Sequence, residues 1–273
     1  MTMCPPKTKF TLILWTGLGI NLQYELYLLF AGLVIIAALY SSVGHGGASG
    51  YLALLSLTSY GVMSHVWLKQ HVWVMNLVVA SIAFYHYNKL GYHNTKLTFP
   101  FIIASIPMAF IGGAIAVDAE IYDILLSLTL IWASYKILNI SDFSNIKASY
   151  PGSLESYLWG GGIGFFSGII GVGGGIFLSP IILLKGWADI KTAAATAAIF
   201  IFVNSLAGLF GMVASAQLQI DFSLLLILIL AIIIGGFLGS LYGAKYANNK
   251  RVRSLLAVVL IVAAMKRVIE LII

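Results

Sequence analysis

The fold is decided by one charge-free stretch, residues 156–184, which reads SYLWGGGIGFFSGIIGVGGGIFLSPIILL. A helix that crosses a bilayer needs about 20 predominantly apolar residues, and this stretch exceeds that length. A glycine run, GVGGG at 171–175, interrupts it. Because glycine lets a helix unwind inside a membrane, the stretch predicts a membrane helix, a break and a second, shorter helix.

The composition of the whole chain is that of a membrane protein. Hydrophobic residues make up 60% of its 273 residues, charged residues only 9%, and the mean hydropathy is +1.00. A soluble globular domain carries about a quarter charged residues, so a soluble enzyme, a nucleic-acid-binding domain and a disordered chain are excluded. The net charge of +6 is scattered through apolar sequence, which indicates membrane topology. The single cysteine, Cys4, excludes an internal disulfide and a thiolate metal cluster.

Further charge-free gaps predict an all-α polytopic membrane protein, because the alternating polarity of a β-barrel strand is not seen. Two of the ten hydrophobic segments are too short to cross a core of about 30 Å. A helix over 48–60 would reach only about 20 Å, and one over 174–185 would be shorter still. The predicted segments are 24–43, 48–60, 65–88, 97–117, 121–140, 154–171, 174–185, 189–214, 221–245 and 252–272.

The chain shows an internal duplication. Pairing Gly46 with Gly174 sets an offset of 128 residues, and the same offset pairs Asn76 with Asn204. The predicted divisions are an N-terminal segment at 1–23, a first transmembrane repeat at 24–140, a linker at 141–153 and a second repeat at 154–273. The N-terminal segment resembles a signal peptide but lacks a persuasive cleavage site, so we interpret it as uncleaved.

Each half has about five segments, an odd number, so we expect the halves to lie in opposite orientations as an inverted repeat. The broken short helices would then meet near the membrane centre. Basic loops near Lys89 and Lys96 and at 245–253 fit the cytoplasmic side, whereas basic residues near the C-terminus fit poorly. If the two short segments are re-entrant, each half has four spans and the halves are parallel. We favour the inverted repeat.

The paired glycine breaks predict an anion site. A short helix that begins at a break points free N–H groups and its positive dipole end into the protein. Two such ends form an anion site near the midplane. The alternative is that the glycines only let helices pack closely. The glycines predicted to line the site are Gly44, Gly46, Gly47, Gly173, Gly174 and Gly175.

Polar side chains flank the first break. Ser41, Ser42, His45 and Ser49 can each donate a hydrogen bond to an oxyanion. His45 lies deep in a charge-free stretch, where an ionisable group is a functional candidate. It is also the candidate for proton coupling, because imidazole titrates near neutral pH. The alternative is that His45 is a structural hydrogen-bond donor.

Asn76, Thr196 and Asn204 are predicted to complete the polar shell. The alternative is that they only join helices, because a buried amide needs partners. His65 and Lys69 share a helix face with Asn76, and we expect these two to extend to the membrane interface.

The residue types that are missing favour an anionic substrate. No carboxylate lies deep within a predicted span, whereas cation pumps and proton-coupled carriers usually place one there. The sequence has no G-x-x-x-x-G-K-[ST] loop and no cluster of metal ligands. We therefore expect no ATP hydrolysis by that route, no metal and no cofactor.

Two alternatives to a carrier are a passive anion channel and an intramembrane protease. Residues 47–50 match the G-x-S-G of rhomboid-type serine proteases, with Ser49 as nucleophile and His71 or His86 as base. The second glycine run carries no serine at the matching place, so we do not expect an enzyme.

The chain resembles the TauE/SafE sulfite-exporter family, also called the toluene sulfonate uptake permeases. The resemblance extends over about 30–270 and rests on GVGGG at 171–175, Ser179-Pro180, an Ala/Thr-rich helix at 192–198 and NSLAG at 204–208. The first half departs from the pattern, since His45 occupies a place that is usually apolar.

This resemblance implies a secondary carrier of sulfur-containing anions, such as sulfite, sulfoacetate and other organosulfonates. It implies a plasma-membrane location, the inner membrane of a bacterium. The expected partners are a small anion, the lipid bilayer and a coupling ion such as H⁺, with no nucleic acid.

Overall fold

A computed structural model describes residues 22–117, except Leu57, and 150–248, with isolated positions at 128 and between 250 and 258. In these residues every regular element is a helix and no strand occurs. Isolated positions apart, the predicted segments at 121–140 and 252–272 lie outside the described residues. So do most of the N-terminal segment and of the linker.

The first half begins with a long helix, a short helix and two more long helices. Ser64 accepts a hydrogen bond from the Trp67 N–H and caps α4, and Asn94 caps α5 by accepting from Lys96 and Leu97. These caps satisfy N–H groups that a helix leaves free at its start. The elements are α2 (Leu22–Ser41), α3 (Ala48–Ser56), the 3₁₀ helix η1 (Ser59–Val62), α4 (His65–Lys89) and α5 (Thr95–Ala114).

The second half has the same order of long, short, long and long helices. Asp189 caps α9 and Asp221 caps α10 by accepting two backbone N–H groups each, so caps precede the same two helices as in the first half. The elements are α7 (Ser153–Ile170), α8 (Gly175–Leu184), α9 (Ile190–Ala214), α10 (Phe222–Leu241) and the π-helix η2 (Tyr242–Tyr246).

Five described helices are long and apolar enough to cross a membrane, which confirms the predicted helical multi-pass protein. The helix boundaries lie within a few residues of the predicted segments. The five stretches are Tyr24–Ser41, His65–Lys89, Thr95–Ala114, Ile190–Ala214 and Phe222–Tyr246.

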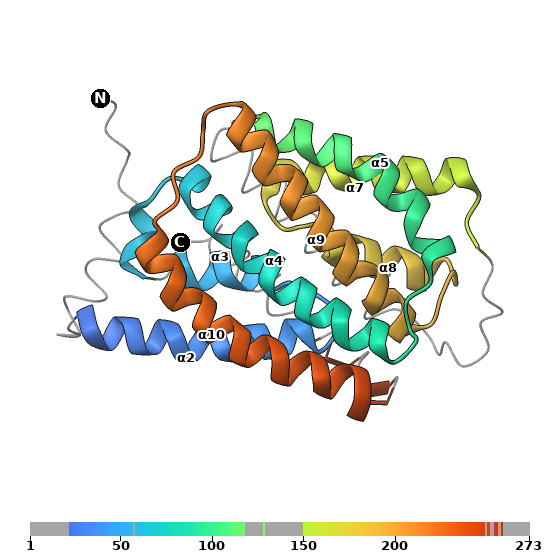
Figure 1. Cartoon of the computed structure of the whole chain (residues 1–273), viewed down its shortest axis with the longest axis horizontal. Helices are drawn as coiled ribbons and strands as arrows, with labels where there is room; N and C mark the ends of the chain where they lie inside the picture. Colours follow the sequence, from blue (N-terminus) through green and yellow to red (C-terminus); the bar gives the residue numbers. More distant parts are fainter. Residues whose placement is uncertain are drawn as a thin grey trace.

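The two short helices do not cross a membrane. α3 has 9 residues and α8 has 10, so their lengths are about 14 and 15 Å at 1.5 Å per residue. A hydrocarbon core is about 30 Å thick. Figure 1 shows both short helices beside the long helices α4 and α9, away from the ends of the molecule. The breaks before them therefore lie inside the protein.

α4 and α9 form the centre of the molecule and run antiparallel (Figure 1). Near the start of α4, the Gln70 Oε1 accepts a hydrogen bond of 2.6 Å from the Gln219 N–H, beyond the end of α9. Near the start of α9, the Lys191 Nζ donates to the Tyr92 hydroxyl, beyond the end of α4, at 3.3 Å. Both helices have 25 residues.

The outer helices pack through glycines. α10 lies against α2 because Gly235 and Gly239 leave no side chain between them and the α2 carbonyls of Val34 and Ala38. α7 lies against α5 in the same way, with Gly160 and Gly164 on the α5 carbonyls of Phe101 and Ser105. Small residues are what allow such close contact in a membrane, where no hydrophobic effect drives helices together.

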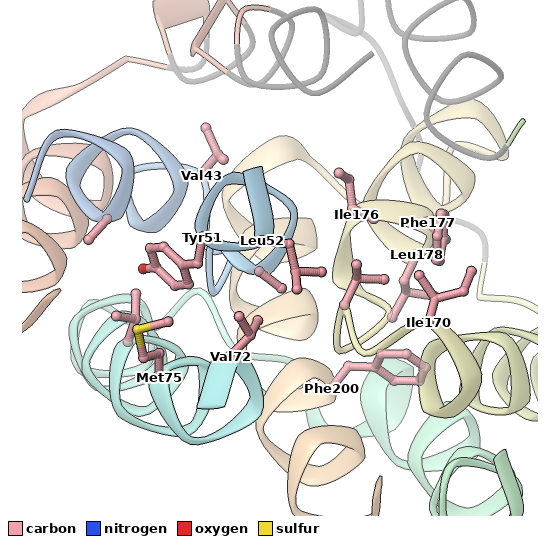
Figure 2. Close-up of a cluster of buried hydrophobic side chains, with 14 of the residues drawn as sticks. Val43, Tyr51, Leu52, Val72, Met75, Ile170, Ile176, Phe177, Leu178 and Phe200 are labelled. Atoms are coloured by element: carbon pink, nitrogen blue, oxygen red, sulfur yellow. The ribbon is translucent and has the colours of Figure 1, made fainter. Parts of the chain in front are cut away.

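The apolar core fills the space between the short helices and the central pair. Figure 2 shows Tyr51 and Leu52 from α3 facing Val72 and Met75 from α4, with Ile176 and Leu178 from α8 beside them. Tyr51, Val72, Met75 and Leu178 are fully buried. The core therefore holds the two glycine breaks in place from both halves.

Positive charge gathers at one end of the molecule, where α4 ends and α5, α7 and α9 begin. Loops with Lys and Arg tend to face the cytoplasm, so this end is expected on the cytoplasmic side. Every described lysine and arginine except Lys69 belongs to this end: Lys89, Lys96, Lys185, Lys191, Lys245, Lys250 and Arg251.

Candidate functional site

The site is built from two backbone breaks that only glycine accommodates well. After α2 the chain turns at Gly44 and Gly47, whose φ angles are +76° and +97°. After α7 it turns at Gly171, Gly173 and Gly174, with φ of +87°, +76° and +81°. Residues with a Cβ atom are strained in this left-handed region. The glycine runs therefore allow each long helix to end inside the protein.

Both breaks face α4 and α9 at the same level. A Cβ atom on Gly46 would collide with the Asn76 Oδ1 and lie 3.1 Å from a methyl of Ile201. One on Gly173 would lie 2.7 Å from that same methyl and 3.1 Å from the Asn76 Nδ2. Asn76 from α4 and Ile201 from α9 thus sit between the two breaks.

A small cavity lies where the breaks meet. Its volume is about 10 Å³, which is close to the room that one water molecule needs. An anion with three oxygens needs more space, so the walls must separate before such a substrate binds. The lining residues are Tyr40, His45, Gly46, Gly47, Ala48, Ser49, Val172, Ile176 and Ile201.

His45 joins the first break to the second half of the chain. Its side chain is buried, and its Nε2 shares a hydrogen bond of 3.0 Å with the Ser179 Oγ on α8. The Nδ1 has no hydrogen-bond partner among the described residues. The ring lines the cavity, and the backbone of Gly175 at the start of α8 also interacts with it.

Ser49 and Tyr40 add two hydroxyl groups to the cavity wall. The Tyr40 hydroxyl and the Ser49 Oγ share a hydrogen bond of 2.7 Å. The Tyr51 hydroxyl, buried beside Gly47, has no partner among the described residues. Hydroxyl groups rotate to donate or accept, so this wall can turn a donor toward an anion.

Two asparagines are buried with unused polar atoms. The Asn76 Nδ2 donates to the Ser205 Oγ at 3.5 Å, while its Oδ1 has no partner among the described residues. Neither polar atom of the Asn204 side chain has one. A buried group without a partner costs about 1–3 kcal/mol. Neither asparagine lines the cavity, although Asn76 contacts both breaks.

The electrostatics of the site favour an anion. No side chain caps the N-terminus of α8, which begins at Gly175 directly after the second break. Its first-turn N–H groups and the positive end of its dipole point toward the centre. None of the cavity-lining residues is a carboxylate.

Comparison with known proteins decides the family. The family model described as Sulfite exporter TauE/SafE matches residues 28–267. The chain belongs to the TauE/SafE sulfite-exporter family. It is also 32% identical over 236 residues to a probable membrane transporter protein, y4hK, of Sinorhizobium fredii, covering 85% of this chain and 94% of the relative. No solved structure matches the chain.

As a TauE/SafE protein, the chain is a membrane transporter with several membrane-crossing helices, as expected for the bacterial inner membrane. The predicted residues His45, Gly46, Gly47 and Ser49 line the cavity of this transporter. Asn76 and the second glycine run lie directly beside it.

Three predicted side chains of the transporter do not line the cavity: two bond nearby carbonyls of α2, and one bonds a neighbouring helix. The Ser41 Oγ donates to the Ala38 carbonyl, and the Ser42 Oγ donates to the Leu39 carbonyl within α2. The Thr196 Oγ1 shares a hydrogen bond of 3.1 Å with Thr98 on α5. Predicted Gly44 likewise packs against the α9 backbone at Ala194.

Lys69 differs from its expected position. It does not extend to the membrane interface, because its side chain is buried and its Nζ donates to carbonyls at the end of α7. Only the tertiary packing brings these α7 carbonyls to Lys69.

Sequence reasoning missed several residues of the site. Tyr40 and Ser179 both bond predicted residues, and Ser205 bonds Asn76. Ser179 had a signal, since Ser179-Pro180 is one of the motifs on which the family resemblance rests. Tyr40 had none, because its partnership with Ser49 depends on the turn between them.

The protease alternative finds no support in the described geometry. The Ser49 hydroxyl bonds Tyr40 and no histidine. The His71 ring bonds the Trp67 carbonyl and the Asp221 N–H, and the His86 Nδ1 bonds Ser240. Neither candidate base is placed to activate Ser49.

Proposed function

We propose that this TauE/SafE protein is a secondary carrier of a small sulfur-containing anion, sulfite or an organosulfonate, that binds between the two glycine breaks. The observation that carries the proposal is the cavity itself. It joins both breaks, contains no lining carboxylate, and is lined by the ring of His45.

The chemistry of the lining suits oxygen-rich anions. Sulfite and sulfonate oxygens accept hydrogen bonds, and the site offers donors from His45, the Tyr40–Ser49 hydroxyl pair and the Asn76 amide. Backbone N–H groups at Gly46, Gly47, Gly174 and Gly175 are proposed to supply most of the stabilisation, as at other helix N-termini that bind anions. The sulfite in the family's name supports sulfur as the central atom.

Alternating access is proposed to move one half against the other as an inverted repeat. The equal lengths and antiparallel course of α4 and α9 support this arrangement. So do the matching contacts of α2 with α10 and of α7 with α5. Opening would break the bond between His45 and Ser179, which joins the halves across the cavity.

A coupled proton is proposed to bind His45, because its Nδ1 can accept one. The substitution His45→Ala is expected to alter the pH dependence of transport. An unchanged pH profile would assign the coupling to another group.

Counterflow in proteoliposomes tests the carrier. Vesicles preloaded with unlabelled sulfite should transiently accumulate ³⁵S-sulfite against its gradient, with saturation as the external concentration rises. A passive channel would show no such overshoot and would give single-channel currents in planar bilayers. The variant Asn76→Ala removes an amide that contacts both breaks and should reduce the overshoot, whereas Ser81→Ala on the exposed face of the same helix should not.

A further inference from the structure

Lys69 is a buried cation outside the proposed carrier site. It is the fifth residue of α4, and its side chain is only 3% exposed. Among the described lysines and arginines it alone lies away from the basic end of the molecule. Charged residues inside membrane helices are rare, and they mark substrate or ion pathways by default.

The ammonium group of Lys69 has incomplete compensation. Its Nζ donates to the carbonyls of Ile169 at 3.2 Å and Gly168 at 3.4 Å, in the last turn of α7. The described residues place no carboxylate within 4.0 Å of it. A helix C-terminus carries about half a negative charge, and an ammonium has three donors. The ammonium also lies 5.0 Å from the centroid of the Trp73 ring. One of its three N–H groups therefore has no hydrogen-bond acceptor among the described residues.

The side chain lies against the second glycine break. A Cβ atom on Gly171 would collide with the Lys69 methylene groups, so this glycine makes room for the lysine. The next residue, Val172, lines the cavity. Seven residues further along α4, Asn76 contacts Gly173. Lys69 thus packs against the residue that directly precedes a residue of the cavity wall.

The first break has no such charge. Ala194 is the fifth residue of α9, and its carbonyl packs against Gly44 as Lys69 packs against Gly171. The two breaks therefore face equivalent helix positions, one with a lysine and one with an alanine. Among the described residues, Lys69 is the one cation beside a glycine break, and it lies on the side away from the basic end.

We propose that Lys69 is a specificity-determining residue whose ammonium supplies the fixed positive charge for the transported anion. This inference rests on the proposed function. In the closed conformation the α7 carbonyls hold the ammonium. When the walls separate, the flexible side chain of Lys69 lets its third N–H reach an anion oxygen between the breaks. Because the ammonium is positively charged, the site prefers anions over neutral analogues of the same shape.

The test compares Lys69→Met with Lys191→Met. Lys191 is a matched control, because it is also buried, donates to a helix-terminal carbonyl at Ala244 and stands over an aromatic ring. Titration calorimetry of each purified protein with sulfite, at constant pH and ionic strength, gives the dissociation constant. We expect Lys69→Met to weaken binding at least about tenfold, as loss of a charge-assisted hydrogen bond implies. Lys191→Met should stay within about twofold of the wild type.

A second pair of variants distinguishes loss of the charge from misfolding of the protein. Lys69→Arg keeps the charge and Lys69→Gln removes it while keeping a donor, so the Arg variant should bind sulfite more tightly than the Gln variant. Equal dissociation constants for the wild type, Lys69→Gln and Lys69→Met would overturn the role of Lys69 and leave the proposed function standing. If the wild type binds no anion at all, the proposed function fails, and the role of Lys69 falls with it.

Discussion

At the scale of single residues, the hydrogen bond between His45 and Ser179 joins the two halves at the cavity. A second bond of the same kind joins His86 on α4 to Ser240 on α10 at 2.7 Å, away from the cavity. The pair allows a histidine that lines the cavity to be compared with one that does not.

We predict that His45→Ala lowers the rate of sulfite counterflow by about tenfold or more, since losing a hydrogen bond to a charged group costs about 1.5–3 kcal/mol. His86→Ala should leave that rate within about twofold and lower the unfolding temperature, because it only breaks a contact between helices. Equal loss of transport in both variants would contradict the role of His45.

Residue types were more predictable than their partners. His45 and Ser49 were identified because polar groups in charge-free sequence are conspicuous, and both line the cavity. Their partners Tyr40 and Ser179 were missed, because hydrogen bonds across 9 and 134 residues depend on how the chain folds back. The serines of α2 were predicted to face the site, but serine can bond the carbonyls of its own helix, and these do.

At the scale of secondary-structure elements, the breaks depend on glycines with both an unusual φ and no room for a side chain. Gly174 has φ of +81°, and a Cβ atom there would lie 2.7 Å from Phe200 and 2.9 Å from Ile163. Gly91 has φ of +77° but no atom within 4 Å of the added Cβ.

We therefore predict that Gly174→Ala destabilises the protein more than Gly91→Ala. Backbone strain alone costs about 1–2 kcal/mol, which is the expected effect at Gly91. Overpacking adds about 1–3 kcal/mol at Gly174. Thermal unfolding in detergent measures both. Equal unfolding temperatures for the two variants would show that the second break is less tightly packed than described.

The short helices were predictable because a length limit applies. Segments 48–60 and 174–185 could not cross a bilayer, and α3 and α8 are shorter still. Their end points were less predictable: the first segment contains both α3 and η1, because Thr58 caps a new turn that hydropathy does not register.

At the scale of the whole molecule, the charges predict an orientation in the membrane. The end that carries Lys96 and Lys245 should face the cytoplasm, and the end with Ser64 should face the opposite side. In a Cys4→Ser background, cysteines at these positions can be tested with an impermeant maleimide on whole cells. We predict labelling at 64 only. Labelling at 96 or 245 would reverse the proposed orientation.

The architecture was predictable in class but less so in detail. The alternation of charge-free gaps predicted the helices, and the glycine runs predicted breaks at the right places. The offset of 128 was less reliable, since aligning the starts of α4 and α9 places Ile201 opposite Asn76, and Asn204 one turn further on. Both Ile201 and Asn76 contact the breaks. Such a shift of register between repeats depends on loop lengths that apolar sequence does not reveal.

The most direct test of the central claim is thermal stabilisation of the purified wild type by a panel of anions. The panel contains sulfite, sulfate, thiosulfate, sulfoacetate, acetate and phosphate. A ligand at 100 times its dissociation constant stabilises by about 2.7 kcal/mol. We predict a rise in unfolding temperature with a sulfur oxyanion that is lost in His45→Ala. No rise with any anion, in protein that unfolds cooperatively, would contradict an anion site between the glycine breaks.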